Sequence, residues 1–232
     1  MVQKQLSTSI VKKFIPSRKS NSRKGDNGIV LVLGGSYIYH GAPILSSIAA
    51  LRCGTDLVYT CVPKINVAST RAVSPNLIVI PLVDQKLTKG AVNKLLGVLP
   101  RNLDSATIGM GLAIQERNSL LHLVKSLLDR DVRLSLDASA LIPEVLPLLA
   151  NKNVVVTPHT GEFKRLFGEL PSNSKSQRIK LVETNAKKNG VTILLKGTTD
   201  IISNGTTTYI YEKKIPAMTV GGTGDVLSGL VA

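Results

Sequence analysis

The chain has 232 residues, of which 43% are hydrophobic and 3% aromatic, and its formal net charge at pH 7 is +14. This composition is typical of a globular domain with a substantial core and excludes a disordered chain. The apolar runs are too short to cross a bilayer, and the first residues lack the apolar core of a secretory signal. The two cysteines, Cys53 and Cys61, form no C-x-x-C pair, which argues against a zinc site or a disulfide scaffold and favours the cytoplasm.

Seven Lys and Arg residues precede the first acidic residue, Asp26. Clustered positive charge attracts phosphates, so a nucleic-acid binder is one interpretation, and the acid-free start also loosely resembles a transit peptide. The chain has no Trp and no ribonucleoprotein, zinc-finger or helix-turn-helix pattern, which argues against nucleic acid. We interpret the excess charge as a solvated surface that favours polyanionic small molecules.

Short β-rich runs alternate with helical stretches, and this order predicts a mainly parallel sheet covered by helices. The predicted strands are residues 29–33, 56–62, 77–80, 106–109, 132–136, 154–157 and 191–195, and the predicted helices are 42–53, 88–99, 116–129 and 174–189. Residues 200–203 and 206–211 flank Asn204-Gly205, which predicts a late antiparallel hairpin at the edge of the sheet.

No internal repeat and no interdomain linker interrupts this order, so we expect one domain over residues 1–232. A final apolar helix begins near Thr223 and has run for fewer than ten residues when the sequence stops at Ala232. We therefore expect the chain to lack closing C-terminal helices.

The segment Gly221 to Leu230 carries the strongest chemical signal. Glycines allow backbone N–H groups to converge, and the start of a helix favours an anion, so Gly222, Thr223 and Gly224 suit a phosphate. Asp225 lies in the same turn, where it is either a general base or an acid that complements the helix dipole.

Five predicted strand ends carry glycines or polar groups, and ligands collect at this edge of an open parallel sheet. One of them is Asp137 after residues 132–136, where an unpaired buried charge would be costly, so it either meets a cation or a metal or caps a helix. Gly34-Gly35-Ser36 and Gly41-Ala42 follow the first strand, Gly109 and Gly111 follow the fourth, and each pair also suits an ordinary tight turn. His159 and Glu162 are three residues apart and can face the same side, although a lone histidine is often a helix cap. The loop Lys196-Gly197-Thr198-Thr199-Asp200 combines a cation with hydroxyls, which suits phosphate or ribose contact as well as a plain connection.

Taken together, these segments resemble the ADP/ATP-dependent NAD(P)H-hydrate dehydratases, a branch of the ribokinase-like fold. The resemblance is carried in order by residues 24–28, 33–36, 41–43, 157–163, 195–197 and 218–227. It implies a three-layer α/β/α fold and includes Lys24, which indicates that the basic start belongs to the domain.

The resemblance also implies a reaction. ADP or ATP would phosphorylate the ring hydroxyl of the (6S) hydrate of NADH or NADPH, and loss of phosphate would restore the cofactor. Asp225 would be the base, and the amides of Gly222, Thr223 and Gly224 would stabilise the transferred phosphoryl group. By position, Ala42, Gly109 or Gly111, His159 and Asp225 would contact the hydrate, whereas Lys196, Gly197, Thr198, Thr199, Asp200 and Gly224 would hold the adenine nucleotide. Mg²⁺ would bridge the phosphates, with Glu162 as an indirect partner.

The resemblance further implies a homo-oligomer, with a tetramer as one form, and a separate epimerase in the same pathway. Two other functions stay open on the sequence alone. One is a ribokinase-like kinase that phosphorylates a vitamin precursor or a sugar and releases the phosphorylated product. The other is a nucleotide or nucleic-acid binder without catalysis, which the +14 charge motivates.

Overall fold

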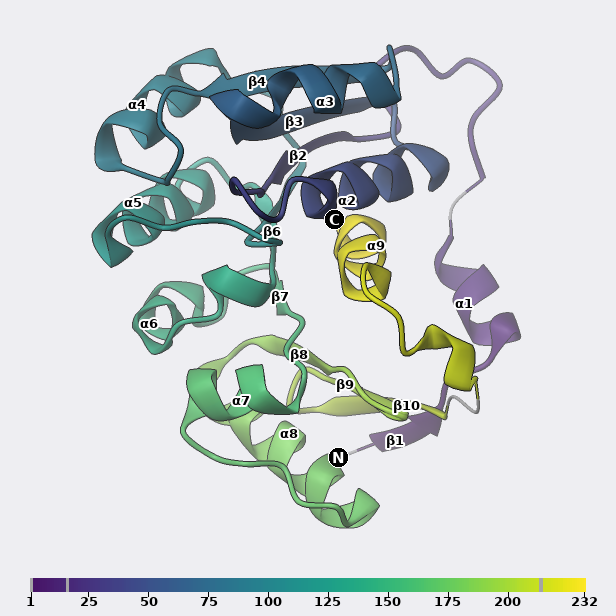
Figure 1. Ribbon diagram of the computed structural model, residues 1–232. Coiled ribbons are helices and arrows are strands. Elements are labelled where there is room, and N and C mark those ends of the chain that lie inside the picture. Colours follow the sequence, from purple (N-terminus) through teal and green to yellow (C-terminus); the bar gives the residue numbers. More distant parts are fainter. Residues whose placement is uncertain (1, 16, 213–214) are drawn as a thin grey trace. The chain divides into compact units, whose positions relative to one another are not determined.

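A computed structural model describes residues 2–15, 17–212 and 215–232 (Figure 1). The chain divides into two compact units. Unit 1 contains residues 1–22 and 141–218, and unit 2 contains residues 23–140 and 219–232. In the part of the chain that the structure describes, no helix combines the length and the apolar character that a membrane span requires.

Unit 2 contains five parallel strands in the order β6-β5-β2-β3-β4. Their bounds are β2 Ile29–Leu33, β3 Leu57–Pro63, β4 Leu77–Leu82, β5 Ser105–Ile108 and β6 Arg133–Leu136. All residues of β2 and β5 are buried, as expected for central strands that have both faces covered.

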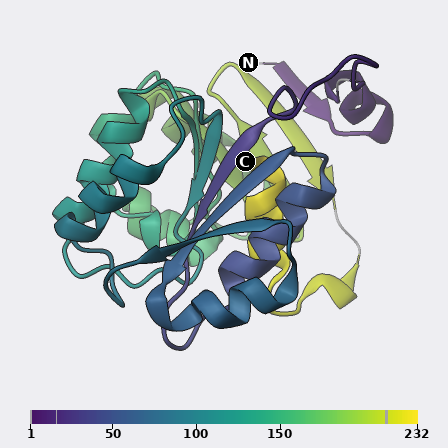
Figure 2. The same cartoon turned by 90° about the horizontal axis from the view of Figure 1, so that it is seen from above.

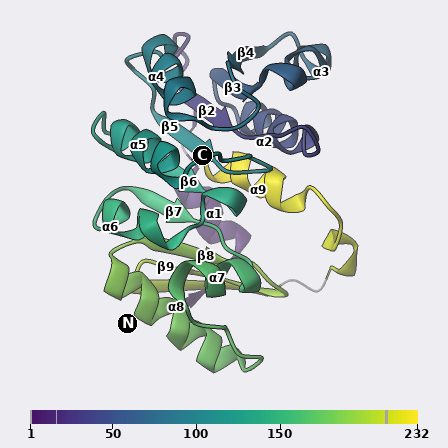
Figure 3. The same cartoon turned by 60° about the vertical axis from the view of Figure 1, so that its left-hand side comes forward.

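The helices of unit 2 lie on both faces of its strands (Figure 3). Helices α2 (Gly41–Arg52) and α9 (Thr223–Val231) pack together, with α2 on β2 and β3 and α9 on β5 and β6. Figure 2 shows α2 and α9 side by side in a second view. Helices α4 (Lys89–Val98) and α5 (Arg117–Leu128) pack on each other, and α3 (Val67–Val73) packs on β4. Short 3₁₀ turns, η1 (Lys64–Asn66) and η2 (Ala138–Ala140), complete this unit.

Unit 1 contains strands in the order β1-β10-β9-β8-β7. Strands β7 (Val154–Val156) and β8 (Thr192–Leu195) are parallel, and β9 (Thr199–Ser203) is antiparallel to both β8 and β10 (Thr207–Glu212). The predicted hairpin around Asn204-Gly205 is therefore present. Its predicted place at the edge of the sheet is wrong, because residues 2–5 pair outside β10 and form the edge. Strand β1 (Val2–Gln5) pairs in parallel with β10, which places the start of the chain in the sheet of this unit.

The helices of unit 1 are α1 (Thr8–Phe14), α6 (Leu146–Leu149), α7 (Thr160–Phe167) and α8 (Lys175–Asn189), with 3₁₀ turns η3 (Pro143–Val145) and η4 (Pro216–Met218). Helix α8 packs on β8 and β9, and α7 packs on η3. Phe163 of α7 is fully buried and its ring lies 4.6 Å from that of Phe167, centroid to centroid.

Candidate functional site

Residues predicted to form the site fall into two groups, one in each unit. Unit 2 contains Ala42, Gly109, Gly111 and the segment Gly222 to Asp225, and unit 1 contains His159, Glu162 and the segment Lys196 to Asp200.

The start of α9 has the geometry that the glycine-rich segment predicts. Gly222 is the N-cap residue, with a left-handed φ of 94°, and a Cβ at this position would lie 2.7 Å from Leu45 of α2. Glycine is therefore favoured here by the backbone conformation, and a larger residue would also displace the end of the Leu45 side chain. The amide of Val226 donates the first helical bond, of 2.9 Å, to the carbonyl of Gly222. Asp225 lies three residues after the cap, so its carboxylate belongs to the first turn, where the helix dipole favours a negative charge.

Hydroxyl groups of unit 2 hold α9 in place. Ser46 of α2 donates a hydrogen bond of 2.6 Å from its Oγ to the backbone carbonyl of Asp225. Three residues further along, the Oγ of buried Ser228 lies 2.6 Å from Oγ1 of Thr107 on β5. These bonds join the helix to both α2 and a central strand. The Asp225 carboxylate is thus carried on a fixed element, which a positioned base requires.

The structure brings Ala42 and Gly111 together. Gly111 has a φ of +63°, and a Cβ on it would lie 2.6 Å from Cβ of Tyr39 and 3.3 Å from Cβ of Ala42. Gly109, which directly follows β5, also has a positive φ and is closely approached by the backbone of Asp137. Both glycines therefore have a packing reason to be glycine, and their predicted contact with the substrate stays a prediction.

His159 and Glu162 form a capping box at the start of α7. Nδ1 of His159 accepts hydrogen bonds from the amides of Gly161 at 3.0 Å and Glu162 at 3.3 Å, while Oε2 of Glu162 accepts one of 2.8 Å from the amide of His159. Because Nδ1 is an acceptor, we assign the proton of the neutral ring to Nε2. Nε2 lies 3.5 Å from Oε1 of Glu162. The expectation that the two side chains share one side of the helix is confirmed, and the histidine side chain is 60% exposed to solvent.

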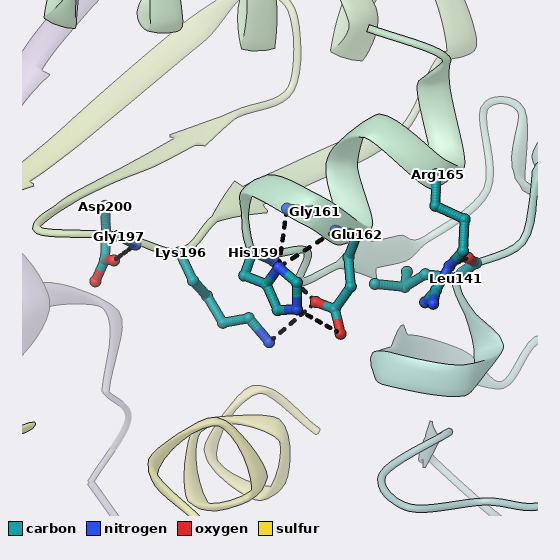
Figure 4. Close-up of polar contacts among 8 residues, drawn as sticks. All are labelled: Leu141, His159, Gly161, Glu162, Arg165, Lys196, Gly197 and Asp200. Atoms are coloured by element: carbon teal, nitrogen blue, oxygen red, sulfur yellow. Dashed lines mark hydrogen bonds and ion pairs between the residues drawn. The ribbon is translucent and has the colours of Figure 1, made fainter. Parts of the chain in front are cut away.

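Lys196 is held next to this capping box. The backbone amide of Lys196 donates a hydrogen bond of 2.8 Å to the carbonyl of Pro158, since the parallel strands β7 and β8 end side by side. Its Nζ lies 3.7 Å from Oε2 of Glu162 (Figure 4). The side chains of Lys196 and Glu162 are only 18% and 10% exposed, so the cation balances a carboxylate that is largely shielded from water.

The rest of the Lys196 loop is ordered by Asp200. Oδ1 of this buried residue accepts a hydrogen bond of 3.0 Å from the amide of Gly197 (Figure 4). Gly197 and Thr198 lie exposed at the tip, and Thr199 begins β9. The carboxylate of Asp200 thus shapes the loop from inside, which leaves the exposed tip for contact with a ligand.

Two residues near the predicted groups were missed by sequence reasoning. Arg178 of α8 lies 3.4 Å from Oγ1 of Thr160, and its guanidinium would be 3.3 Å from a Cβ on Gly197. Ser46 supports Asp225 as described above. Nothing in the neighbouring sequence marks either residue as part of a site. Arg178 lies in a helix rich in Lys and Arg, and Ser46 lies in a run of small residues.

Among the described residues, no group of three or more His, Cys, Asp or Glu side chains could hold a metal ion. Unit 2 therefore offers a carboxylate at the glycine-rich start of a helix. Unit 1 offers an imidazole, an ammonium group and an exposed loop tip. These suit proton abstraction and binding of phosphate or ribose groups.

Residues 30–232 match the NAD(P)H-hydrate dehydratase family, which covers most of both units. The chain belongs to the NAD(P)H-hydrate dehydratase family. Two relatives are each named ADP-dependent (S)-NAD(P)H-hydrate dehydratase. The protein of Nitrosopumilus maritimus is 87% identical and that of Cenarchaeum symbiosum 62% identical, each over all 232 residues of this chain and 81% of the relative.

A solved member of the NAD(P)H-hydrate dehydratase family has the same fold. The ADP/ATP-dependent NAD(P)H-hydrate dehydratase from Bacillus subtilis, co-crystallized with ATP and Mg²⁺, matches with a TM-score of 0.79 and 26% identity over 93% of this chain and 75% of that chain. A ribokinase-like superfamily protein from Enterococcus faecalis also matches, with a TM-score of 0.78 and 26% identity over 99% of this chain and 78% of that chain. The family resemblance and the ribokinase-like fold class predicted from the sequence are therefore confirmed, as is the expectation of an enzyme of the lyase class.

Proposed function

We propose that this chain catalyses the ADP-dependent dehydration of the (6S) hydrate of NADH or NADPH, which restores the reduced cofactor. Membership of the dehydratase family and the names of two relatives at 87% and 62% identity support the reaction and the choice of ADP as donor. The observation that carries the proposal is the carboxylate of Asp225 in the first turn of α9, beside a glycine N-cap.

Asp225 takes the proton of the ring hydroxyl as that oxygen attacks the terminal phosphoryl group of ADP. The new O–P bond forms as the bond from phosphorus to the AMP oxygen breaks. Phosphate then leaves the ring carbon with the bonding electrons, and the neighbouring carbon gives up a proton, so the double bond returns and the products are NAD(P)H, AMP and phosphate. A general base of this kind contributes roughly 10² to 10⁴ in rate.

The backbone of Gly222, Thr223 and Gly224 stabilises the negative charge on the phosphoryl group during transfer, since the first amides of a helix point out of its start. A glycine cap also lets the phosphate approach the backbone closely.

The remaining residues bind the two nucleotides. Ala42, Gly109 or Gly111, and His159 contact the hydrated dinucleotide, for which the imidazole offers its Nε2 proton. Lys196, Gly197, Thr198, Thr199 and Asp200 hold the adenine nucleotide together with Gly224. The half-exposed loop with its cation and hydroxyls supports this assignment.

Mg²⁺ is the expected partner of the ADP phosphates, and when bound it neutralises their charge. Glu162 does not fit direct coordination, because its carboxylate already lies against the His159 amide, the His159 ring and the Lys196 ammonium. A contact through water is compatible with this arrangement, and Mg²⁺ commonly keeps several of its waters.

We further propose that residues 1–232 form one domain, since the family match continues through parts of both units. A homo-oligomer such as a tetramer, a separate epimerase as pathway partner and a cytoplasmic location stay predictions. The free thiols of Cys53 and Cys61 agree with the last of these.

Product analysis tests the proposal against the kinase alternative. Phosphorus NMR of a reaction with ADP, Mg²⁺ and the NADPH hydrate is expected to show AMP and inorganic phosphate in amounts equal to the NADPH restored. A stable phosphate ester without NADPH would indicate a kinase instead. A protein that binds nucleotide without any turnover would indicate the binder.

A further inference from the structure

The loop between β2 and α2 exposes three large apolar side chains in succession. Tyr37, Ile38 and Tyr39 are 71%, 73% and 63% exposed, although the whole chain contains only five tyrosines. Single exposed apolar residues are common, but a continuous group of them usually marks a binding surface. The proposed reaction as described above uses none of the three.

The base of this loop is fixed. The side-chain amide of buried Asn66 donates a hydrogen bond of 2.8 Å to the carbonyl of Ser36, and Oγ of Ser36 accepts one of 3.2 Å from the amide of Tyr39. The amide of Gly35 donates to the carbonyl of Met110 at 2.9 Å. A rigid loop that carries exposed aromatic rings loses little conformational entropy when it binds, which is the property of a prepared contact surface.

The loop also lies next to residues proposed to contact the dinucleotide. A Cβ on Gly111 would meet the Cβ of Tyr39 at 2.6 Å and its carbonyl oxygen at 3.0 Å, and Ala42 begins the helix directly after the loop. Both tyrosines follow the carboxyl end of β2, which is the edge where open parallel sheets bind ligands.

We propose that Tyr37 and Tyr39 form a stacking surface for a planar base of the dinucleotide substrate. This inference rests on the proposed function and adds a binding contact to it. An aromatic ring can stack on the flat face of any base, whichever hydrogen-bonding groups the base carries on its edge. The two tyrosines would therefore add binding affinity for the dinucleotide, whereas Asp225 acts as the base in the reaction.

Kinetics of single variants test the contact. Tyr39→Ala is expected to raise the KM for the NADPH hydrate roughly 5- to 150-fold, the range found when one base-stacking ring is removed, with the KM for ADP unchanged. Tyr39→Phe keeps the ring and is expected to behave as the wild type, and Tyr37→Ala is expected to act in the same direction as Tyr39→Ala. Ile38→Ala is the matched control, because it removes an equally exposed apolar side chain from the same loop without removing a ring.

A binding measurement separates this inference from the proposed reaction. The chain has no tryptophan, so Tyr39→Trp introduces a single fluorescent reporter. If NADPH and hydrated reduced nicotinamide mononucleotide both quench its emission and ADP does not, the ring stacks on the nicotinamide half. If NADPH alone quenches the emission, the ring stacks on the adenine half. Either result upholds the inference even if no turnover is detected.

Three results would overturn the inference. The first is an unchanged KM for the hydrate in Tyr39→Ala together with no quenching of Tyr39→Trp by NADPH. The second is quenching of Tyr39→Trp by ADP alone. The third is an emission maximum of Tyr39→Trp that moves to shorter wavelength as the protein concentration rises. The second assigns the loop to the phosphoryl donor, and the third assigns it to a contact with a second copy of the chain.

Discussion

Ser46 of α2 donates its hydroxyl proton to the backbone carbonyl of Asp225 over 2.6 Å. This bond ties the first turn of α9 to a neighbouring helix at the residue that the proposed mechanism uses as its base. Because a base acts only within hydrogen-bond reach of its proton, a small movement of this turn changes the rate.

Ser46→Ala is therefore expected to lower kcat several-fold and the free energy of unfolding by about 1 kcal/mol, the usual net worth of one hydrogen bond. Enzyme assays and urea titration measure the two effects. Ser47→Ala is the matched control, since Ser47 is equally buried on α2 and donates a similar hydroxyl-to-carbonyl bond of 2.7 Å to Pro43. It is expected to reduce stability comparably and to leave kcat unchanged. Equal losses of kcat in both variants would contradict a special role for the Ser46 bond.

His159 is predicted to combine two roles that substitutions can separate. His159→Ala removes both hydrogen bonds to the start of α7 and is expected to cost about 1 kcal/mol of unfolding free energy, a typical cost of losing an N-cap. His159→Asn places a favourable N-cap residue there and is expected to retain most of that stability. Both variants are expected to raise the KM for the hydrate, because both lose the imidazole. An asparagine variant with normal kinetics would restrict His159 to helix capping.

The buried Cys61, compared with the exposed Cys53, provides a test of the core of unit 2. Burial raises the pKa of the Cys61 thiol strongly and that of the Cys53 thiol less. Because its pKa is raised in the folded state, the Cys61 thiol keeps its proton in the folded protein at a pH where the unfolded chain loses it. Its contribution to the free energy of unfolding is therefore fully present below the ordinary thiol pKa of about 8.5 and declines as the pH rises above that value. Urea titrations between pH 7 and pH 10 are expected to show a smaller alkaline loss of stability in Cys61→Ala than in Cys53→Ala. The opposite order would show that Cys61 is accessible to water.

The sequence predicted those parts of the fold that depend on local patterns. The apolar run that became β2, the Asn204-Gly205 hairpin and the facing pair His159 and Glu162 are set by hydrophobic pattern, turn chemistry and helix spacing respectively. Strand β1 was not predicted, because Val2 to Gln5 is exposed throughout and is a strand only through its pairing with β10, some two hundred residues later.

The supporting residues of the candidate site were likewise beyond local reasoning. Ser46 and Asp225 are far apart in the chain, and their bond exists because α2 and α9 pack together. Lys196 could be identified as a cation at a strand end, but its approach to Glu162 follows from the pairing of β7 with β8. The exposed tyrosines of the β2–α2 loop carry no periodic signal at all, and they became notable only when their surroundings were known.

The most direct test of the account is the recovery of absorbance near the reduced-nicotinamide band when hydrated NADH is incubated with ADP and Mg²⁺. The wild type is expected to restore the band only when ADP is present. Asp225→Asn, which keeps the size of the side chain and removes its basicity, is expected to bind ADP normally and to lose roughly 10² to 10⁴ of the rate. Recovery at the wild-type rate in Asp225→Asn would contradict the assignment of Asp225 as the base.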